Sequence, residues 1–459
     1  MSHSIVNREE ELGFLESLAR EERAQFVILY GRRRVGKTFL IQHFLKDKPH
    51  VSYQCSEGNE TEQIRLLSGV VANRFNDKAL SLNPFTDWHS LFNYLADKTG
   101  KERTYISIDE FPLLVTANGA VSSIFQKYWD EHLSKTRIFL ILCGSSISMM
   151  ERETLAYKSP LYGRRTGQWK VEPLKFHDVS KFFKGKNPEK VIEFYSVTGG
   201  IPFYLEELDL GTDIRENILL RIAKKGRILY EEGELLIKEE LKEPATYFSI
   251  IEAIATGKSR QTEIANCVKM ESTSITRYLT TLIRLGFIER IVPVTEKKKT
   301  KKALYVIRDP FMAFWFKFVY PNKSYIESGE QHRLREHLDR EFNRHVSIVF
   351  ESVCTDFIRA NGKFDFKEFG KWWGSYSEEG ERKTAEIDIV ATNKETKDIL
   401  FGECKWSNDV DAEEVLRRLR KKAELVEWNK GGRTERFAIF AKSFKRRVDG
   451  ASLFDLKDL

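Results

Sequence analysis

Cysteine is scarce in this chain. The five cysteines stand at positions 55, 143, 267, 354 and 404, and no two of them have C-x-x-C spacing. An odd number of widely spaced cysteines is typical of reduced thiols in an intracellular protein rather than of a disulfide-stabilised secreted domain. The nine histidines are also scattered without metal-ligand spacing, which argues against a zinc site.

Long hydrophobic runs are missing as well. The longest aromatic run, Phe311 to Tyr320, is interrupted by Lys317 and is too short to cross a bilayer. Residues 4–12 are acidic and lack the apolar stretch of a signal peptide. The sequence therefore predicts a soluble, cytoplasmic protein that does not bind a membrane.

Neither sign of charge dominates. The chain has 75 lysines and arginines against 68 aspartates and glutamates, a formal net charge of +7, and this modest excess does not by itself indicate a nucleic-acid partner. A composition with 41% hydrophobic and 31% charged residues is that of a globular protein. At about 100–200 residues per domain, 459 residues predict about three domains.

The sequence does contain a complete phosphate-binding loop. Residues 31–38 have the pattern G-x-x-x-x-G-K-[ST], between an apolar run at 26–29 and the start of a helix. In this strand–loop–helix order, backbone N–H groups can surround a polyphosphate. Lys37 would reach the β- and γ-phosphates and Thr38 would bind Mg²⁺, so we expect ATP and Mg²⁺ as cofactors; a chance glycine-rich turn is the less favoured interpretation. The loop residues expected at the nucleotide are Gly31, Arg32, Arg33, Arg34, Val35, Gly36, Lys37, Thr38 and Phe39.

A pair of carboxylates ends a second apolar run. Residues 104–108 predict a strand, and Asp109 and Glu110 follow it directly. Asp109 would hold Mg²⁺, directly or through water, and Glu110 would polarise the attacking water. A solvated acidic pair after a strand is the common alternative, but the phosphate loop upstream favours catalysis. A third strand at 138–143 leads to Ser145, which could contact the γ-phosphate or the water.

The N-terminal half resembles the archaeal-type ATPases of the wider AAA-like and STAND-like P-loop group. The resemblance covers about residues 1–240 and lies in an ordered set of motifs rather than in any one of them. The motifs are N-R-E-E-E-L at 7–12, the phosphate loop, I-D-E at 108–110, C-G-S-S at 143–146, L-Y-G-R-R-T-G at 161–167 and G-G-I-P at 199–202.

This resemblance implies roles for further residues. Arg8 would lie near the nucleotide base, and Pro202 would lie in a helical lid over the nucleotide. Arg164 or Arg165 would be presented to a γ-phosphate, in cis or from a neighbouring subunit, because the developing charge needs a planar, permanent cation. An exposed turn is an equally good interpretation of this arginine pair. Catalysis is accordingly expected to depend on a homo-oligomer.

Residues 244–308 have the layout of a winged helix-turn-helix domain. The pattern predicts helices from Pro244, over 261–265 and over 271–285, followed by strands at 287–292 and 303–307. We expect Ser272 to cap the third helix.

Two groups of side chains in this region are candidates for binding DNA. The exposed face of the third helix would offer Thr273, Thr276 and Arg277 to bases or phosphates. The tip between the strands has five lysines in six residues, which would neutralise phosphates and release counterions. They are Lys297, Lys298, Lys299, Lys301 and Lys302. DNA is the favoured partner, with a solvated turn or a protein-docking module as the alternatives.

Two predicted strands near the C-terminus carry acidic residues. Residues 385–391 alternate like a half-buried strand and 399–406 predict the returning strand. Alternation puts Glu403 and Lys405 on one face, and the hairpin would bring Asp388 beside Glu403. An amphipathic helix over about 341–359 could deliver a third carboxylate, Glu351.

Residues 340–459 therefore resemble the PD-(D/E)XK nucleases. The resemblance implies that Asp388, Glu403 and Glu351 hold Mg²⁺, and that Lys405 orients or deprotonates the attacking water or stabilises the phosphorane charge. Ile387 stands before Asp388, where the name of the motif has proline. A hairpin with an aspartate and an E-x-K on its polar face also arises by chance.

Taken together, the sequence predicts an α/β multidomain protein. The expected parts are a P-loop ATPase core (1–170), a helical lid (171–243), a winged helix-turn-helix (244–308), a linker (309–339) and a nuclease-like domain of the restriction-endonuclease type (340–459). The favoured function is an ATP-hydrolysing, DNA-binding protein with a metal-dependent nuclease domain. The alternative is a STAND-like regulatory or signalling ATPase whose nuclease-like domain is inactive and binds DNA or protein.

Overall fold

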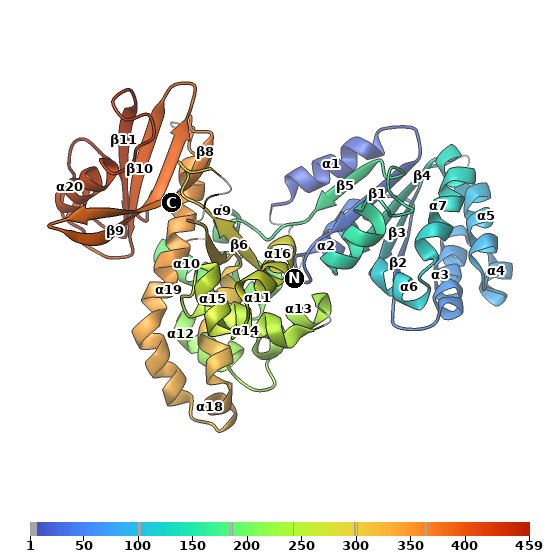
Figure 1. Cartoon of the computed structure of the whole chain (residues 1–459). Helices are drawn as coiled ribbons and strands as arrows, with labels where there is room; N and C mark the ends of the chain where they lie inside the picture. Colours follow the sequence, from blue (N-terminus) through green and yellow to red (C-terminus); the bar gives the residue numbers. More distant parts are fainter. Residues whose placement is uncertain are drawn as a thin grey trace. The chain divides into compact units, whose positions relative to one another are not determined.

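The computed structural model describes residues 7–459 except residues 100, 101, 184, 186, 242, 298, 299, 301, 363 and 364. The chain forms two compact units, Met1–Leu174 with Ile201–Phe203, and Lys175–Gly200 with Tyr204–Leu459. Each unit contains one five-stranded sheet, and Figure 1 shows the two sheets with their helices.

A parallel sheet organises the first unit. Its strand order is β2–β3–β4–β1–β5, and all four pairings are parallel. Strands β1, β3 and β4 are buried at every residue, as expected when helices cover both faces of a sheet and the strands are nearly continuous apolar runs. The predicted parallel P-loop sheet is therefore confirmed. The strands are β1 (Gln25–Tyr30), β2 (His50–Gln54), β3 (Thr104–Asp109), β4 (Ile138–Gly144) and β5 (Gly167–Lys170).

Helices connect these strands. Asn59 and Asp77 accept hydrogen bonds from backbone N–H groups at the starts of α3 and α4, which satisfies donors that a helix start leaves unpaired. The helices are α1 (Glu9–Ala19), α2 (Lys37–Leu45), α3 (Glu60–Phe75), α4 (Lys78–Leu82), α5 (Trp88–Thr99), α6 (Phe111–Ala117), α7 (Val121–Glu131) and α8 (Ile147–Met150).

Five α-helices lie in the described part of 171–243, the range expected to form a helical lid. The segment Ile201–Phe203, which includes the start of α11, clusters with the first unit, whereas the helices on either side belong to the second unit. These helices are α9 (Phe176–Ser180), α10 (Pro188–Thr198), α11 (Pro202–Glu206), α12 (Ile214–Asn217) and α13 (Ile228–Glu240).

Three helices and a hairpin come next, close to the expected ranges. They are α14 (Pro244–Ala255), α15 (Gln261–Cys267), α16 (Ser272–Arg284), β6 (Ile288–Ile291) and β7 (Leu304–Ile307), with β6 and β7 antiparallel. The expected cap is wrong in one respect. Ser272 is the first helical residue of α16 and Glu271 is the N-cap, which makes no side-chain capping bond.

A buried aromatic segment joins this region to the C-terminal part. It comprises α17 (Pro310–Phe314), a wide helical turn at Trp315–Val319 and α18 (Lys323–Glu327). Trp315 is fully buried and its indole N–H donates to the Tyr230 carbonyl at 3.0 Å. A Cβ at Gly233 would lie 2.3 Å from the Trp315 ring, so α13 can approach it only with glycine there.

The helix α19 (Gln331–Ala360) is 30 residues long and starts ten residues before the expected helix over 341–359. Its buried residues begin with Leu334 and Leu338, so the apolar stripe extends through the expected linker. The expected boundary between residues 339 and 340 consequently falls inside one helix. Near the middle of α19, the fully buried His345 donates from Nε2 to the Ser196 carbonyl of α10 at 2.8 Å.

The C-terminal sheet has the strand order β12–β11–β10–β9–β8. The pairs β8–β9 and β9–β10 are antiparallel, whereas β10–β11 and β11–β12 are parallel. One helix, α20 (Ala412–Ala423), crosses over from β10 to β11. The strands are β8 (Glu368–Glu378), β9 (Glu381–Asn393), β10 (Asp398–Lys405), β11 (Thr434–Ala441) and β12 (Ser452–Phe454).

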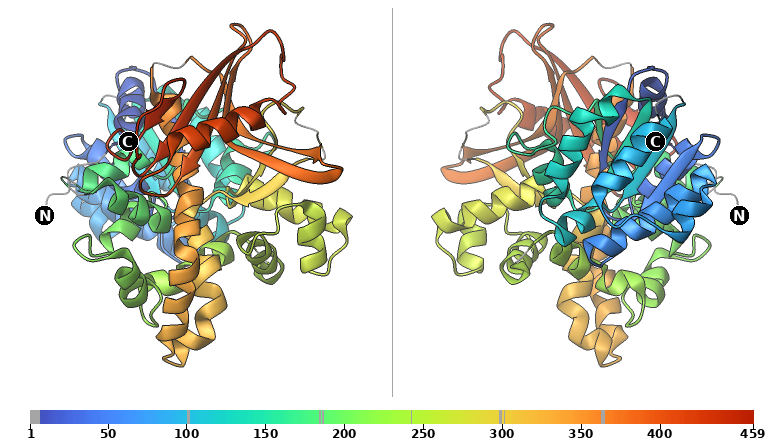
Figure 2. Two further views of the ribbon diagram at one scale, coloured as in Figure 1. Left: turned by 90° about the vertical axis from the view of Figure 1, so that its left-hand side faces the viewer. Right: turned by 90° about the vertical axis from the view of Figure 1, so that its right-hand side faces the viewer.

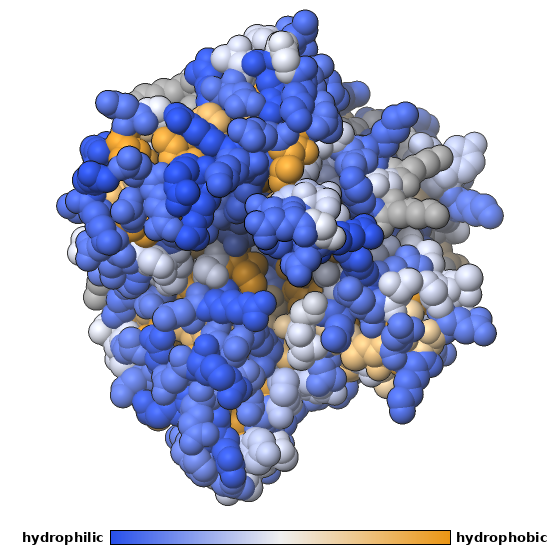
Figure 3. All heavy atoms as spheres, turned by 60° about the vertical axis from the view of Figure 1, so that its left-hand side comes forward, coloured by the Kyte–Doolittle hydropathy of each residue, from blue (hydrophilic) through white to orange (hydrophobic). Residues whose placement is uncertain are grey.

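The surface is polar over the face drawn in Figure 3, where apolar side chains show only in patches between hydrophilic ones. Among the helices in the described part of the chain, none has the length and apolar character needed to cross a membrane.

Candidate functional site

The phosphate-binding loop connects the end of β1 to the start of α2. A Cβ at Gly31 would lie 2.3 Å from the Val171 carbonyl oxygen, so any larger residue would displace the loop or that carbonyl. Gly36 has φ +97° and is the N-cap of α2, a conformation that glycine adopts without strain. The two glycines of the motif therefore fix the tight path of the loop.

The charged end of the loop meets the acidic strand end. Lys37 is buried and its Nζ donates to the Arg32 carbonyl at 3.0 Å. The Thr38 hydroxyl donates to Asp109 Oδ2 at 2.5 Å. Strand β4 lies between β1 and β3, yet the carboxyl ends of these parallel strands meet at the same edge of the sheet. The structure thus brings Thr38 and Asp109 together.

Glu110 is held in an unusual backbone conformation beside this pair. Its φ is +53°, in the left-handed region that non-glycine residues rarely occupy outside constrained sites. Its Oε2 accepts hydrogen bonds from the Ser145 backbone N–H at 3.1 Å and from the Ser145 hydroxyl at 2.9 Å. Ser145 therefore orients the carboxylate that the sequence assigns to water activation.

Arg8 contacts the phosphate loop through its guanidinium group. It is buried, and it donates to the Val35 carbonyl and to the Glu172 carbonyl, both at 2.9 Å, and to Glu11 at 2.8 Å. Its φ of +98° is also left-handed. Arg8 thus lies against the backbone of the loop.

The other expected nucleotide residues surround the loop. The Arg34 guanidinium lies 4.3 Å above the ring of Phe203, which follows Pro202 at the start of α11. Arg33 is exposed, and Phe39 is 42% exposed in the first turn of α2. The Val35 side chain is fully buried and anchors the loop.

The arginine pair lies in the connection that leads to β5. Arg164 forms an ion pair with Asp130 at 3.0 Å, and Arg165 donates to the Thr154 carbonyl at 3.5 Å. Burial raises the pKa of Tyr30, the nearby charges of Glu151 and Glu172 add to that effect, and the charge of Arg165 opposes it. Arg165 is therefore within electrostatic reach of the residue that precedes Gly31.

The expected DNA-binding residues lie on α16 and beside the hairpin. Thr273, Thr276 and Arg277 are exposed; Thr276 Oγ1 accepts from Gln261 at 3.0 Å and Arg277 lies 4.6 Å from the Tyr278 ring. Lys297 and Lys302 are exposed, and Lys302 forms an ion pair with Glu296 at 2.5 Å. Lys298, Lys299 and Lys301 lie outside the described residues.

In the C-terminal sheet, the β9–β10 hairpin places Asp388 next to the E-x-K strand. Asp388 Oδ2 accepts a hydrogen bond from the Cys404 backbone N–H at 2.9 Å. The register of β8 and β9 shifts between Gly370 and Trp372, so that β9 has one extra residue near Asp388. A β-bulge re-aims side chains in this way and is often found beside active sites.

Lysines accompany the expected carboxylates. Lys405 and Lys422 form ion pairs with Glu403 at 2.8 and 3.0 Å, and Lys371 of β8 pairs with Glu351 of α19. Lys371 and Lys422 were not expected from the sequence, because each reaches its carboxylate across elements whose register the local pattern does not define. Within the described residues, no three histidine, cysteine, aspartate or glutamate side chains are grouped so that they could hold a metal ion as they lie.

The electrostatics of this site are dominated by burial. Burial, together with the charges of Glu351 and Glu403, raises the pKa of Asp388 to about 7, although the Cys404 N–H and the charge of Lys405 oppose the rise. Burial also raises the pKa of Glu351, although the neighbouring Lys371 opposes that rise. The negative charges of Glu351 and Glu403 are thus compensated by direct ion pairs with lysines, whereas Asp388 accepts a hydrogen bond from a backbone N–H.

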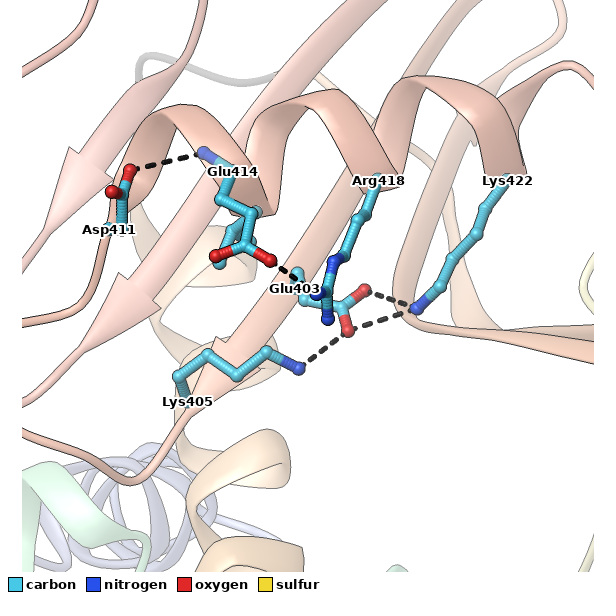
Figure 4. Close-up of a pocket in the computed structure, with 7 residues that line it drawn as sticks. Glu403, Lys405, Asp411, Glu414, Arg418 and Lys422 are labelled. Atoms are coloured by element: carbon cyan, nitrogen blue, oxygen red, sulfur yellow. Dashed lines mark hydrogen bonds and ion pairs between the residues drawn. The ribbon is translucent and has the colours of Figure 1, made fainter.

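A pocket of about 230 Å³ opens beside Glu403. Figure 4 shows Glu414, Arg418 and Lys422 projecting from α20 toward Glu403 and Lys405 on β10. Arg418 pairs with Glu414, and Lys422 pairs with Glu403. The pocket is thus lined by side chains of both charges: Glu403, Lys405, Asp411, Glu414, Val415, Arg418 and Lys422.

Comparison with known proteins finds matches to both parts of the chain. Residues 5–208 match a family described as "ATPase domain predominantly from Archaea". The whole chain is 37% identical to an uncharacterized protein of Methanocaldococcus jannaschii over 462 residues, 99% of each. The chain belongs to this family of archaeal-type ATPases. The expected archaeal-type ATPase domain, and the ATPase activity that it implies, are confirmed.

Further matches agree with this membership. A 44-residue stretch is 63% identical to an uncharacterized ATP-binding protein of the same archaeon, covering 10% of this chain and 75% of that protein. The Walker-type ATPase of Pyrococcus abyssi shares the fold, with a TM-score of 0.50 and 22% identity over 68% of this chain and 96% of that one. Residues 315–418, which carry Glu351, Asp388, Glu403 and Lys405, match a family described as "Archaea bacterial proteins of unknown function".

The raised pKa of Asp388 predicts a pH-dependent stability. Because the pKa is near 7 in the folded chain and near 3.9 in an unfolded one, the folded state retains a proton between about pH 4 and pH 7, and stability falls as pH rises through this window. Asp388→Asn keeps an acceptor for the Cys404 N–H but cannot ionise. We expect it to be more stable than the wild type at pH 8, by about 1–4 kcal/mol, and similar at pH 4, in urea unfolding with a chelator present. A matched control is Asp365→Asn, which replaces an exposed aspartate. If Asp388→Asn differed from the wild type in stability by the same amount at pH 4 and at pH 8, the raised pKa of Asp388 would be contradicted.

Proposed function

We propose that this ATPase binds DNA through residues 244–308 and cuts it at a metal-dependent site in the C-terminal sheet. The observation that carries the proposal is the placement of Glu351, Asp388, Glu403 and Lys405. A helix and two adjacent strands deliver them to one region, in the element order helix, three antiparallel strands, helix, parallel strand. This order and these residue types support a PD-(D/E)XK-like fold over residues 340–459.

The ATP site of the first unit would work through the residues already placed. The phosphate loop suits ATP because its glycines permit the tight path of the backbone and Lys37 is buried at its end. Thr38 and Asp109 are oxygen ligands of the kind that Mg²⁺ prefers, 2.5 Å apart. Glu110, oriented by Ser145, would orient and polarise the attacking water.

Residues around the phosphate loop would bind the rest of the nucleotide and stabilise the charge that develops on the γ-phosphate. Arg8 and Pro202 would border the nucleotide, with α9–α13 as a lid over it. Arg164 or Arg165 would stabilise the γ-phosphate charge, and Arg164 would have to leave Asp130 to do so. A homo-oligomer could supply either arginine from a neighbouring subunit.

For the second site, the fit to a metal ion depends on rotations of two carboxylates. Glu403 would exchange its contacts with Lys405 and Lys422 for the ion, and Glu351 would exchange Lys371. Asp388, which accepts a backbone N–H, needs the compensation most, because burial and two neighbouring carboxylates disfavour its ionised form. Glu351, Asp388 and Glu403 would hold Mg²⁺, which would supply a Lewis acid for a scissile phosphate, and Lys405 and Lys422 would be available to bind phosphate oxygens.

The second candidate function is a regulatory ATPase of the STAND-like kind whose C-terminal domain does not cut. The observation that favours it is the same set of ion pairs. With Lys371 on Glu351 and Lys422 on Glu403, the charges of two expected metal ligands are already compensated by protein side chains.

The ATPase assignment predicts a separation of binding from hydrolysis. Lys37→Ala should remove ATP binding, because it deletes the only lysine of the loop. Glu110→Gln should keep binding but lower the hydrolysis rate by roughly 10²–10⁴, because the amide cannot accept a proton. Equilibrium nucleotide binding and phosphate release measure the two effects. The exposed Glu22→Gln serves as control, and wild-type turnover by Glu110→Gln would show that the water is activated elsewhere.

The lysine-rich tip predicts a salt-dependent affinity for DNA. Replacing Lys297, Lys298 and Lys299 by alanine should reduce the slope of log K against log salt by about 0.9 for each phosphate that the variant no longer neutralises. The same three changes to arginine keep the charge and should keep the slope. Titrations of duplex DNA at several salt concentrations give the slopes. An unchanged slope in the alanine variant would assign residues 244–308 to protein docking.

The nuclease assignment predicts that two single changes separate the activities. Asp388→Ala and Lys405→Ala should each abolish DNA cleavage and leave ATP hydrolysis and DNA affinity nearly unchanged. Mg²⁺ or Mn²⁺ should support cutting and Ca²⁺ only binding, and the assay uses single-stranded, duplex and branched DNA with and without ATP. Lys394→Ala, an exposed lysine of the same domain, is the control. If the wild type cuts none of these substrates with any metal, the regulatory function is the correct one.

A further inference from the structure

The segment between β6 and β7 is docked on the edge of the C-terminal sheet. On one arm, the Val294 N–H donates to the Lys371 carbonyl of β8 at 2.9 Å. On the other arm, the Lys302 carbonyl accepts from Trp373 Nε1, also of β8, at 3.1 Å. Figure 2 shows the yellow β6–β7 hairpin beside the orange strands of that sheet. Both arms are thus hydrogen-bonded to one strand.

Packing reinforces these two hydrogen bonds. Val294 packs on the core cluster that contains Trp372 and Ile387. Gly370 lies beside Val294 as well: a Cβ at Gly370 would be in ordinary van der Waals contact with Val294 Cβ, at 3.4 Å. The segment therefore covers the edge of β8 around Gly370–Trp373, where the strand would otherwise be free to pair with another strand.

The docking point coincides with the candidate nuclease site. The Lys371 carbonyl accepts the hydrogen bond from the Val294 N–H, while Lys371 Nζ pairs with Glu351 and lies 3.9 Å from Glu386. Lys371 also stands where the register of β8 and β9 shifts at Asp388. One residue of β8 therefore touches both the hairpin and a carboxylate of the site.

The charges along this route suit a polyanion. Among the residues that the structure describes, Lys297 is exposed, and the side chains of Lys302, Lys371 and Lys405 are 53%, 31% and 40% exposed. Glu296 and Glu386 offset part of this charge, through their contacts with Lys302 and Lys371. A nucleic-acid backbone could follow the lysines from the tip onto the sheet, with counterion release favouring binding.

We propose that the β6–β7 hairpin and β8 form one continuous DNA-binding surface, which sets where the DNA backbone lies relative to Glu351 and Asp388. The proposal rests on the proposed DNA binding by residues 244–308. The hairpin is a separate two-stranded sheet that is held against β8 through Val294 and Lys302, so DNA bound along its Lys302 arm would cross the C-terminal sheet at a fixed place.

Hydrogen exchange of the full chain, with and without duplex DNA in Ca²⁺, tests the surface without requiring cleavage. With DNA at about ten times its Kd, amides of 288–307 and of 368–374 should both exchange roughly tenfold more slowly. Trp373→Phe removes the N–H that holds Lys302 but keeps an aromatic ring. In this variant, only 288–307 should remain protected by DNA. Trp428→Phe, at a tryptophan that packs on the same core cluster, should behave like the wild type.

The other outcomes are separable. Protection of 288–307 with β8 unaffected in the wild type would overturn the continuous surface and leave DNA binding by 244–308 intact. Protection of neither segment would overturn both. Equal protection of β8 in the wild type and in Trp373→Phe would show that the contact of Trp373 with Lys302 does not set where DNA lies on the sheet, which also contradicts the proposal.

Discussion

The structure depends most on the burial of carboxylates at the ends of strands, where each one needs a partner. In the first unit, Asp109 emerges at the end of β3 and is 6% exposed, and the Thr38 hydroxyl is its partner across the intervening strand β4. The end of β4 is crowded by the helices that follow β3 and β4. A Cβ at Gly144 would lie 2.6 Å from Pro112 and 2.7 Å from Met150, so the glycine there allows α6 and α8 to pack closely beside the site.

In the C-terminal sheet, the buried carboxylates have partners of a different kind. It buries Glu403 to 6% exposure and supplies two lysines, while Asp388 receives a backbone N–H and retains a raised pKa. The protein thus contains a site whose polar groups are paired and a second site in which one carboxylate is left under-compensated. Perturbed groups of this second kind concentrate at functional sites, which is the physical reason to look for chemistry there.

Local patterns in the sequence predict most of the elements and some of the contacts. The apolar runs and glycines predict the parallel sheet and the phosphate loop, and alternation predicts the β9–β10 hairpin that brings Asp388 to Glu403, because these features depend on neighbours in sequence. Lys371 and Lys422 could not be predicted, since their contacts depend on a bulge and on how α20 lies over the sheet. The assignment of Ser272 as the cap was wrong, because α16 begins at Ser272 itself, one residue earlier than a helix capped by Ser272 would begin.

The helix α19 has a mechanical consequence. At about 1.5 Å per residue its 30 residues span roughly 45 Å. His345 on this helix donates its Nε2–H to the Ser196 carbonyl. Burial lowers the pKa of His345 to about 4, so the imidazole is neutral at neutral pH and keeps this hydrogen bond. Soon after Ser196 the chain passes through Gly199 and Gly200 into Ile201–Phe203, which belongs to the ATPase unit and places Phe203 under Arg34. Glu351 lies on the same helix six residues after His345, so one rigid element of the second unit carries both the contact to α10 and a carboxylate of the C-terminal site.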